Sequence, residues 1–413
     1  MTEKVSTVFV GIGGYGDLYP SLAEKYQEVG GLCRPSGVVD PFARTAPHYE
    51  WFRRQGVPVF NTLEEFYQTH TADLAVISTP IPLHKPQSLT ALAHGSHVLC
   101  EKPLVPTMAE AGELERAART ANRTLGVGFQ WSFSCTMNRL KGDILEGKYG
   151  RPLMLKSLIC WKRDFHYYQS SAWKGRIADA QGNLIRDSVV TNATAHYLHN
   201  IFFILGKSMA EAAMPDRVEA QVYRAKDIES FDTCVLKGEL AGGTFWYGAS
   251  HSCDLGEQTR FRYTFEKGTV YFNDRPGDPG NHVIGVLSDG REVDYGNPQS
   301  EQESVRKFLA MLTRCRDENS PVACTVSTIK PHLAVCSGLF EQGTICSFPK
   351  DHIFEGSEPD GTRRGTYVRG LSQLLLQAYE REQLPCQMQD AAPLMTHSFI
   401  FQPGKEAGAC ASV

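Results

Sequence analysis

The sequence of 413 residues lacks several features that would assign it to a common class. No run of about 18 apolar residues occurs, so no membrane span is predicted. The chain does not start with a charged segment followed by an apolar one, so no secretory signal is predicted. Lys and Arg number 42 against 46 Asp and Glu, a net charge of −4 that argues against a nucleic-acid-binding protein. We expect a cytoplasmic protein without nucleic-acid or membrane partners.

The twelve cysteines are scattered and form no Cys-x-x-Cys pair. This spacing argues against a zinc ribbon or a thioredoxin-like site and favours reduced, mostly buried thiols. His196 and His199 could be read as a pair of metal ligands. No His-Glu-x-x-His pattern or nearby cysteine supplies further ligands, so we expect no bound metal.

The length predicts two or three domains. The order of predicted strands and helices differs between the first 130 residues and the rest of the chain. Short apolar runs alternate with helical patterns in the first 130 residues, which predicts βαβ units and a parallel sheet. The apolar runs are residues 5–10, 37–39, 57–60, 74–78 and 98–100.

From about residue 151 consecutive strand candidates are joined by short turns, which predicts a mostly antiparallel sheet. The strand candidates are residues 152–160, 218–223, 244–247, 261–265, 269–272 and 283–287. Helical patterns cover 191–205, 304–314, 333–341 and, near the end, 368–380. The predicted fold class is therefore α/β, with a parallel-sheet domain followed by an α+β domain.

A glycine-rich loop, Gly11-Ile12-Gly13-Gly14-Tyr15-Gly16, follows the first strand candidate and opens a helix. In this context the Gly-x-Gly-x-x-Gly pattern predicts a dinucleotide site, because the helix N-terminus offers N–H groups to the pyrophosphate. Asp40 ends the second strand 40 − 16 = 24 residues later, where a carboxylate binds a ribose hydroxyl and favours NAD. Alternatively Asp40 only caps the turn before Pro41. Arg34 and Arg44 are close in sequence to Asp40, and an arginine there would bind the 2′-phosphate of NADP, so NADP stays an alternative.

Two further turns follow predicted parallel strands, at the edge where open α/β sheets bind ligands. One holds Ser78 and Thr79 and leads to His84, and the other is Glu101-Lys102-Pro103. A lysine in a stiff turn at this edge is a candidate for chemistry, although most lysines are solvated surface residues.

Asn192 and His196 stand at i and i+4 in a predicted helix, which would put them on one helix face. The alternative is a structural histidine with satisfied hydrogen bonds. With the glycine loop, Asp40, the two turns, residues 126–130 and His196, the sequence resembles the glucose–fructose oxidoreductase / inositol dehydrogenase (Gfo/Idh/MocA) family over about residues 5–345.

The resemblance implies three parts of the chain. Residues 1–130 would form an NAD(P)-binding Rossmann domain. Residues 131–345 would form a substrate-binding α/β domain whose large open, mostly antiparallel sheet often mediates dimers or tetramers. Residues 346–413 would be an extension that packs on the second domain or at a subunit interface.

The resemblance also implies NAD(P)-dependent oxidation or reduction of a secondary hydroxyl of a sugar, glycoside or cyclitol, for example at C3 of a glucoside. Lys102 would be the base and His196 its partner, while Asn192 replaces the aspartate that many members carry. The implied cofactor-binding residues are Gly11, Ile12, Gly13, Gly14, Tyr15, Gly16, Asp40, Ser78, Thr79, His84, Glu101, Lys102 and Gln130.

An aromatic and basic segment, 161–176, is expected to line the substrate site, because sugar rings have apolar C–H faces and a polar rim. The expected substrate-binding residues are Lys102, Trp161, Arg163, Tyr168, Trp173, Asn192 and His196. An ordinary aromatic cluster between domains is the alternative. Two other functions stay open: an NAD-dependent glycosidase that acts by transient oxidation and elimination, and a non-enzymatic cofactor-sensing protein.

Overall fold

A computed structural model of the chain describes residues 4–357, 364–389 and 393–404. It divides into two compact units, Met1–Ser134 with Gln299–Ile329, and Cys135–Pro298 with Lys330–Val413. The sequence boundaries placed the whole of 131–345 in one domain, whereas the structure returns residues 299–329 to the first unit. Each unit is described by itself below.

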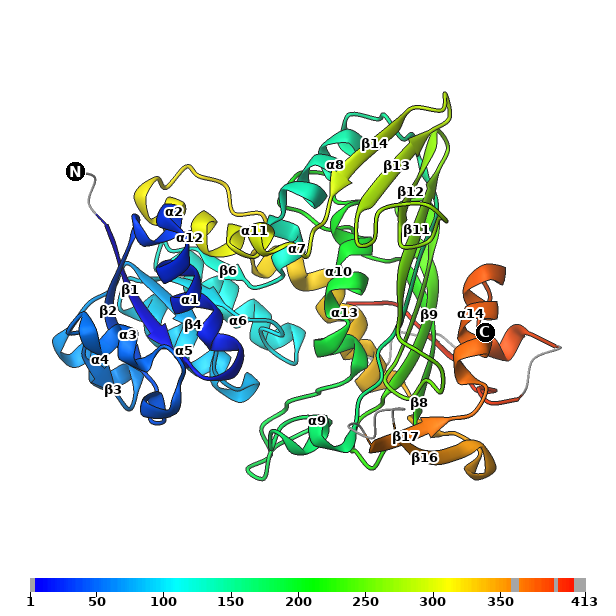
Figure 1. Cartoon of the computed structure of the whole chain (residues 1–413), viewed down its shortest axis with the longest axis horizontal. Helices are drawn as coiled ribbons and strands as arrows, with labels where there is room; N and C mark the ends of the chain where they lie inside the picture. The colour runs from blue at the N-terminus through cyan, green and yellow to red at the C-terminus, as the bar shows by residue number, and fades with distance from the viewer. Residues whose placement is uncertain (1–3, 358–363, 390–392, 405–413) are drawn as a thin grey trace. The chain divides into compact units, whose positions relative to one another are not determined.

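The first unit is built on a six-stranded parallel sheet, as the alternating pattern predicted (Figure 1). Its strands are β1 (Val5–Val10), β2 (Cys33–Val39), β3 (Val59–Phe60), β4 (Leu74–Ile77), β5 (His97–Cys100) and β6 (Leu125–Val127). The strand order is β3-β2-β1-β4-β5-β6. The chain adds strands on one side of β1 up to β3 and then on the other side from β4, so the switch point of this parallel sheet lies between β1 and β4. In doubly wound sheets ligands bind at the carboxyl ends of the strands beside such a switch point.

Short helices connect these strands, and the returning segment adds two more. The helices are η1 (Gly14–Asp17), α1 (Leu18–Lys25), α2 (Gln27–Gly30), η2 (Ala43–Thr45), α3 (Tyr49–Arg54), α4 (Leu63–Thr69), α5 (Ile81–Ala93), α6 (Met108–Thr120), α7 (Gln130–Phe133), α11 (Glu301–Ser304) and α12 (Arg306–Arg316). α12 docks through Phe308, whose ring lies 5.4 Å from Tyr19 and 6.1 Å from Phe9. α13 (Val326–Gln342) passes from this unit to the second.

The second unit holds a ten-stranded, mostly antiparallel sheet. The strands are β7 (Pro152–Cys160), β8 (Arg217–Arg224), β9 (Thr233–Leu240), β10 (Gly243–Ser250), β11 (Gln258–Phe265), β12 (Gly268–Phe272), β13 (Val283–Leu287), β14 (Glu292–Gly296), β15 (Cys346–Ser347) and β18 (Phe399–Phe401). The sequence did not predict β9 or β14, and β7 pairs with β10 in parallel. A hairpin of β16 (Ile353–Ser357) and β17 (Arg364–Val368) lies apart from this sheet.

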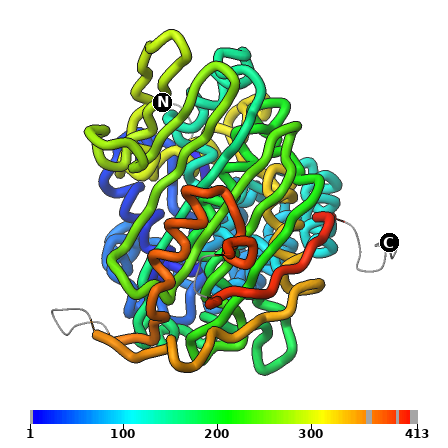
Figure 2. The backbone as a smooth tube through the Cα atoms, turned by 90° about the vertical axis from the view of Figure 1, so that its right-hand side faces the viewer, coloured from blue at the N-terminus to red at the C-terminus, as the bar shows by residue number. Residues whose placement is uncertain are grey.

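Helices cover both faces of the large sheet (Figure 1). The helices of this unit are α8 (Cys135–Leu145), α9 (Phe165–Gln169), η3 (Val189–Ala193), α10 (Ala195–Phe203), η4 (Lys350–His352), α14 (Leu371–Arg381) and η5 (Pro385–Gln387), together with most of α13. α10 packs on one face of this sheet, which we call the inner face, and there the ring of Phe202 meets the ring of Phe245 edge to face at 5.5 Å. α14 lies on the opposite, outer face, across the strands (Figure 2).

The extension after residue 345 belongs to the core of the second unit. Leu371, Leu375 and Tyr379 of α14 share one buried cluster with Leu158 and Trp246 of the outer sheet face. The predicted helix 368–380 is wrong at its start, because β17 continues to residue 368 and Gly370, with φ +82°, makes the turn into α14. Residues 358–363 of the predicted extension lie outside the described residues.

Polar contacts fix the extension against the same face. The Lys156 ammonium, almost fully buried on β7, donates to the Tyr379 carbonyl at 3.0 Å, and the Trp246 indole donates to the Gln383 carbonyl at 2.9 Å. Beyond the extension the outer face becomes charged, with Arg260 and Arg262 of β11 on Asp274. The apolar part of this face is therefore closed by the chain itself.

A buried histidine in the first unit makes its stability depend on pH. Thr124 N–H donates to His97 Nδ1 at 3.0 Å, and burial, with Arg123 and Arg314 nearby, lowers the pKa of His97 to about 4. The unfolded chain, with a pKa near 6.5, binds the proton first, so this contribution is complete above pH 6.5 and is lost as the pH falls toward 4. We expect a loss on the order of 2 kcal/mol. Thermal unfolding of the wild type and His97→Gln across this range measures it, and equal pH slopes would contradict it.

Candidate cofactor and substrate sites

The glycine loop follows β1 at the switch point of the first unit. Gly11 has φ +77°, and a Cβ on it would lie 2.9 Å from the Thr79 side chain. A Cβ on Gly16 would collide with the Gly11 carbonyl, whereas Cβ atoms on Gly13 and Gly14 would meet nothing within 4 Å. Packing thus requires glycine at the ends of the loop, and the middle is open. This arrangement fits the close approach of a dinucleotide pyrophosphate.

Asp40 stands directly after β2 and holds the glycine loop. Its Oδ2 accepts from the Ile12 N–H at 2.9 Å and its Oδ1 accepts from the Phe42 N–H at 2.8 Å. The carboxylate therefore also fixes the following turn, and its remaining lone pairs are those that would accept from a ribose hydroxyl. Arg34 lies six residues earlier on β2, about 20 Å away along an extended strand. Only Arg44 follows Asp40 closely.

Replacing Asp40 with alanine is expected to weaken NAD⁺ binding about tenfold, because hydrogen bonds to a charged group contribute about 1.5–3 kcal/mol. The dissociation constant can be measured by calorimetry. Asp317→Ala is a matched control, since Asp317 also accepts a backbone N–H, from Asn319 at 3.0 Å, but on an exposed turn. Equal constants for wild type and Asp40→Ala would contradict the role of this carboxylate.

The Glu101-Lys102-Pro103 turn follows β5 and is anchored by buried side chains that bind Glu101. Glu101 is 6% exposed, and its carboxylate accepts from the Tyr19 hydroxyl at 2.5 Å and from the Lys307 ammonium. Its other oxygen accepts from the Lys102 N–H at 3.3 Å. Glu101, predicted to bind cofactor, thus directs its carboxylate into the unit and fixes the backbone of Lys102. The Lys102–Pro103 peptide bond is cis.

Lys307 is the residue of this site that the sequence did not reveal. It is fully buried on α12, and it donates to the Tyr15 hydroxyl at 3.1 Å as well as to Glu101. Burial alone would lower the pKa of Lys307, but the Glu101 charge and Tyr15 outweigh it and raise the pKa. Tyr15 in turn donates to the Gln130 side chain at 3.2 Å. The one available signal is that Lys307 and Met311 lie four residues apart in the apolar stripe of a helix.

His84 joins the two turns. Its Nδ1 lies 2.9 Å from the Pro103 carbonyl and its Nε2 lies 2.8 Å from the Thr79 carbonyl. Burial lowers the pKa of His84, and the two carbonyls oppose that shift. The Thr79 hydroxyl donates to Gln87 at 2.6 Å, and the Ser78 hydroxyl is buried and without a hydrogen bond within the described residues. His84 therefore fixes the turn that carries Lys102.

In the second unit the aromatic and basic segment continues from the end of β7. Arg163 N–H donates to the His251 carbonyl at 3.2 Å, so this stretch still runs beside the end of β10. The Trp161 indole donates to the Thr259 hydroxyl at 2.6 Å, and the Tyr168 hydroxyl lies 2.7 Å from His251 Nδ1. Burial, together with Arg163 and Lys226, holds the pKa of His251 well below its usual range. Sequence spacing gave no signal for His251.

Asn192 and His196 do not share a continuous α-helix, so the i, i+4 argument is wrong. Asn192 lies in η3, a π-helix that starts with a capping box at Ser188, and α10 begins only at residue 195. Thr194, with φ −104° and ψ 10°, breaks the helical path between them and hydrogen-bonds through its hydroxyl to Tyr247. Both predicted residues are partly buried in this unit.

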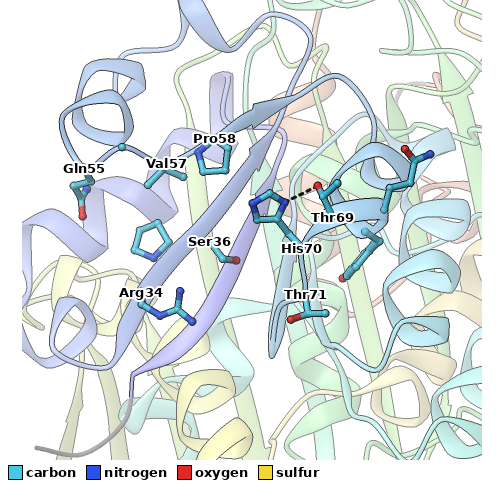
Figure 3. Close-up of a pocket in the computed structure, with 12 residues that line it drawn as sticks. Arg34, Ser36, Gln55, Val57, Pro58, Thr69, His70 and Thr71 are labelled. Carbon is cyan, nitrogen blue, oxygen red and sulfur yellow. Dashed lines mark hydrogen bonds between the residues drawn. The ribbon is translucent and has the colours of Figure 1, made fainter.

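A surface hollow of about 620 Å³ lies elsewhere in the first unit (Figure 3). It is lined by Arg34 and Ser36 of β2, the turn 55–58 and the end of α4, where the Thr69 hydroxyl meets His70 at 2.8 Å. The first residues of β2 line this hollow, whereas Asp40 follows the last residue of the strand. The hollow is therefore separate from the glycine loop, and it contains none of the predicted site residues.

The described residues offer neither a cluster of metal ligands nor a membrane-spanning helix. They contain no group of three or more His, Cys, Asp or Glu side chains arranged to hold a metal ion. None of their helices is both long enough and apolar enough to cross a membrane.

The first unit is similar to proteins of a known family. Residues 5–129 match the family model GFO_IDH_MocA, described as an oxidoreductase family with an NAD-binding Rossmann fold. The chain is 31% identical over 151 residues to a 1,5-anhydro-D-fructose reductase of Ensifer adhaerens, an alignment of 37% of this chain and 43% of that protein. It is 31% identical over 147 residues to an inositol 2-dehydrogenase of Streptomyces avermitilis, covering 35% and 43%. These alignments span less than half of either relative.

The fold as a whole also has solved counterparts. An oxidoreductase from Agrobacterium radiobacter, solved with NAD⁺, L-tartaric acid and magnesium, aligns with a TM-score of 0.65 over 82% of this chain and 96% of its own, at 15% identity. The parallel sheet, the glycine loop and the family match together define an NAD-binding Rossmann fold in the first unit. Over residues 5–129 the chain matches the Gfo/Idh/MocA family.

Proposed function

We propose that this protein is an NAD(P)-dependent dehydrogenase acting on a secondary hydroxyl of a sugar, glycoside or cyclitol. The observation that carries the proposal is the placement of Lys102. It lies at the carboxyl end of β5, on a turn fixed by Glu101 and His84, in the same unit as the glycine loop. Strand ends beside a switch point are where such sheets place reactive groups. The names of the matched reductase and inositol dehydrogenase support the substrate class.

In this proposal the bound nicotinamide supplies the hydride acceptor, and the protein handles the proton. Lys102 takes the proton from the substrate hydroxyl, and His196 is its partner in handling that proton. Asn192 orients a hydroxyl, because an amide donates and accepts hydrogen bonds but does not take a proton.

The second unit would bind the sugar with Trp161, Arg163, Tyr168 and Trp173. Their rings suit the C–H faces of a sugar, and Arg163 suits its polar rim. The expected dimer or tetramer remains a prediction. The apolar outer face over β7 and β10 is not available for it, because α14 covers that face.

A screen of the purified full chain tests the function. Incubation with NAD⁺ or NADP⁺ and with myo-inositol, glucose, methyl glucoside, an anhydrosugar, glucose-6-phosphate or glucuronate is expected to produce the reduced cofactor with at least one of them. Cleavage of a glycoside without lasting NADH would favour the glycosidase. Tight NAD⁺ binding without turnover of any sugar would favour a cofactor-sensing protein. Either outcome would overturn the dehydrogenase.

A further inference from the structure

The segment between β7 and η3 places two cations near the ring of one aromatic residue, Tyr167. The Arg163 guanidinium carbon lies 4.9 Å from the centre of the Tyr167 ring, and Lys174 Nζ lies 4.4 Å from the same centre. Arg163 also lies 5.5 Å from the Trp161 ring, and Lys174 lies 5.8 Å from the Trp173 ring. Positive charges and aromatic faces therefore alternate here.

Neither cation forms an ion pair with a carboxylate of the described residues. Within the part of the chain that the structure describes, no carboxylate oxygen lies within 4.0 Å of the charged group of Arg163 or Lys174. Lys174 Nζ donates instead to the Ser170 hydroxyl at 2.7 Å. Arg176, two residues further along, is different, because it pairs with Glu229 at 2.5 Å. Within this segment the lack of an ion pair is therefore a property of Arg163 and Lys174 and not of Arg176.

The aspartates of this segment are engaged by its own backbone. Asp164 accepts from the Tyr167 N–H at 2.7 Å, and Asp187 accepts from the Gly175 N–H at 2.7 Å. Asp179 accepts from the Asn183 N–H at 2.8 Å. These hydrogen bonds hold the loop in shape. The Asp187 charge still acts on Lys174, since burial lowers the pKa of Lys174 and Asp187 raises it. Neither Arg163 nor Lys174 has a carboxylate of the described residues within ion-pair distance.

Buried nitrogen atoms without hydrogen bonds provide a second observation. Arg163 Nε and His251 Nε2 are buried and have no partner within the described residues. His251 is 2% exposed, and its other ring nitrogen is occupied by Tyr168. Folded proteins leave few buried polar atoms unsatisfied. An acceptor brought by a ligand would satisfy a donor such as Arg163 Nε.

We propose that the sugar carries an anionic oxygen group, a phosphate or a carboxylate, that binds between Arg163 and Lys174 beside Tyr167. Arginine binds such groups with two parallel N–H donors, and lysine adds a point charge. The flanking indole rings of Trp161 and Trp173 would contact the C–H faces of the sugar. This inference rests on the proposed function, because it assigns a charge to the same substrate.

Calorimetric binding of three probes to the full chain with NAD⁺ bound tests the proposal. The probes are glucose-6-phosphate, glucuronate and methyl glucoside, and the proteins are the wild type, Arg163→Gln, Lys174→Gln and, as a matched control, Arg176→Gln. We expect at least one anionic probe to bind about tenfold or more tightly than methyl glucoside, and whichever does identifies the group. Arg163→Gln and Lys174→Gln should each lose about tenfold toward that probe, and Arg176→Gln should not.

Equal affinity for charged and uncharged probes, or an anion preference that survives both substitutions, would overturn the proposal. The absence of binding by all three probes would overturn it as well. NAD⁺ affinity, measured on the same variants, should stay at the wild-type value, which shows that they are folded. Preferential anion binding without NADH formation would support this inference and contradict the dehydrogenase, so the two failures are distinguishable.

Discussion

The Lys102→Met variant should lose about 10²–10⁴-fold in kcat, the range that a positioned general base contributes. Methionine keeps the length of the side chain but cannot take a proton. The effect on NAD⁺ binding should be far smaller, since the glycine loop and Asp40 do not depend on the lysine head group. Steady-state kinetics on the best substrate and calorimetry with NAD⁺ measure the two effects separately.

Lys85→Met is the matched control for this substitution. Lys85 lies on α5 in the same unit, and its ammonium pairs with Glu113 at 2.7 Å rather than standing at a strand end. Its loss should leave kcat near the wild-type value. Full turnover by Lys102→Met would remove this lysine from the chemistry.

Replacing Lys307 with methionine should destabilise the first unit by about 3–5 kcal/mol, because it leaves the Glu101 carboxylate buried and without its cation. For a unit of this size that corresponds to a fall in Tm of about 10 °C. The Glu101 carboxylate would still accept from the Tyr19 hydroxyl, but its charge would be uncompensated. Thermal and denaturant unfolding of the purified variant measure the loss.

Two comparisons separate this buried pair from an ordinary ion pair. Lys25→Met removes an exposed pair with Glu301, and solvent screening leaves such a surface pair with little effect on stability. The double variant Glu101→Gln with Lys307→Met should be more stable than Lys307→Met alone, because no buried charge is left. A loss no larger than that of Lys25→Met would show that the pair does not anchor the Lys102 turn.

The parallel sheet could be predicted because its strands are short, β-branched and buried on both faces, as in β1, where all six residues are buried. β14 was missed because its sequence, Glu-Val-Asp-Tyr-Gly, places charges on a partly exposed strand. The return of residues 299–329 to the first unit could not be predicted, since it depends on tertiary packing of Phe308 and not on local pattern.

The candidate site divides in the same way. The glycine loop, Asp40 and the Lys102 turn were predictable because each stands at a fixed distance from a recognisable strand. The partners of Glu101 were not, since Lys307 lies 206 residues further along the chain. The helix assumed for Asn192 and His196 failed because a local hydrogen bond of Thr194 changes the backbone path, which periodicity does not report.

Deuterium transfer tests the central claim most directly. A sugar that passes the screen is labelled with deuterium on the carbon bearing the reacting hydroxyl, and the nicotinamide recovered after a single turnover is analysed by mass spectrometry. The account predicts one deuterium in the reduced nicotinamide for each sugar oxidised, and no transfer with Lys102→Met on the same timescale. Consumption of the labelled sugar with no deuterium in the nicotinamide would contradict it.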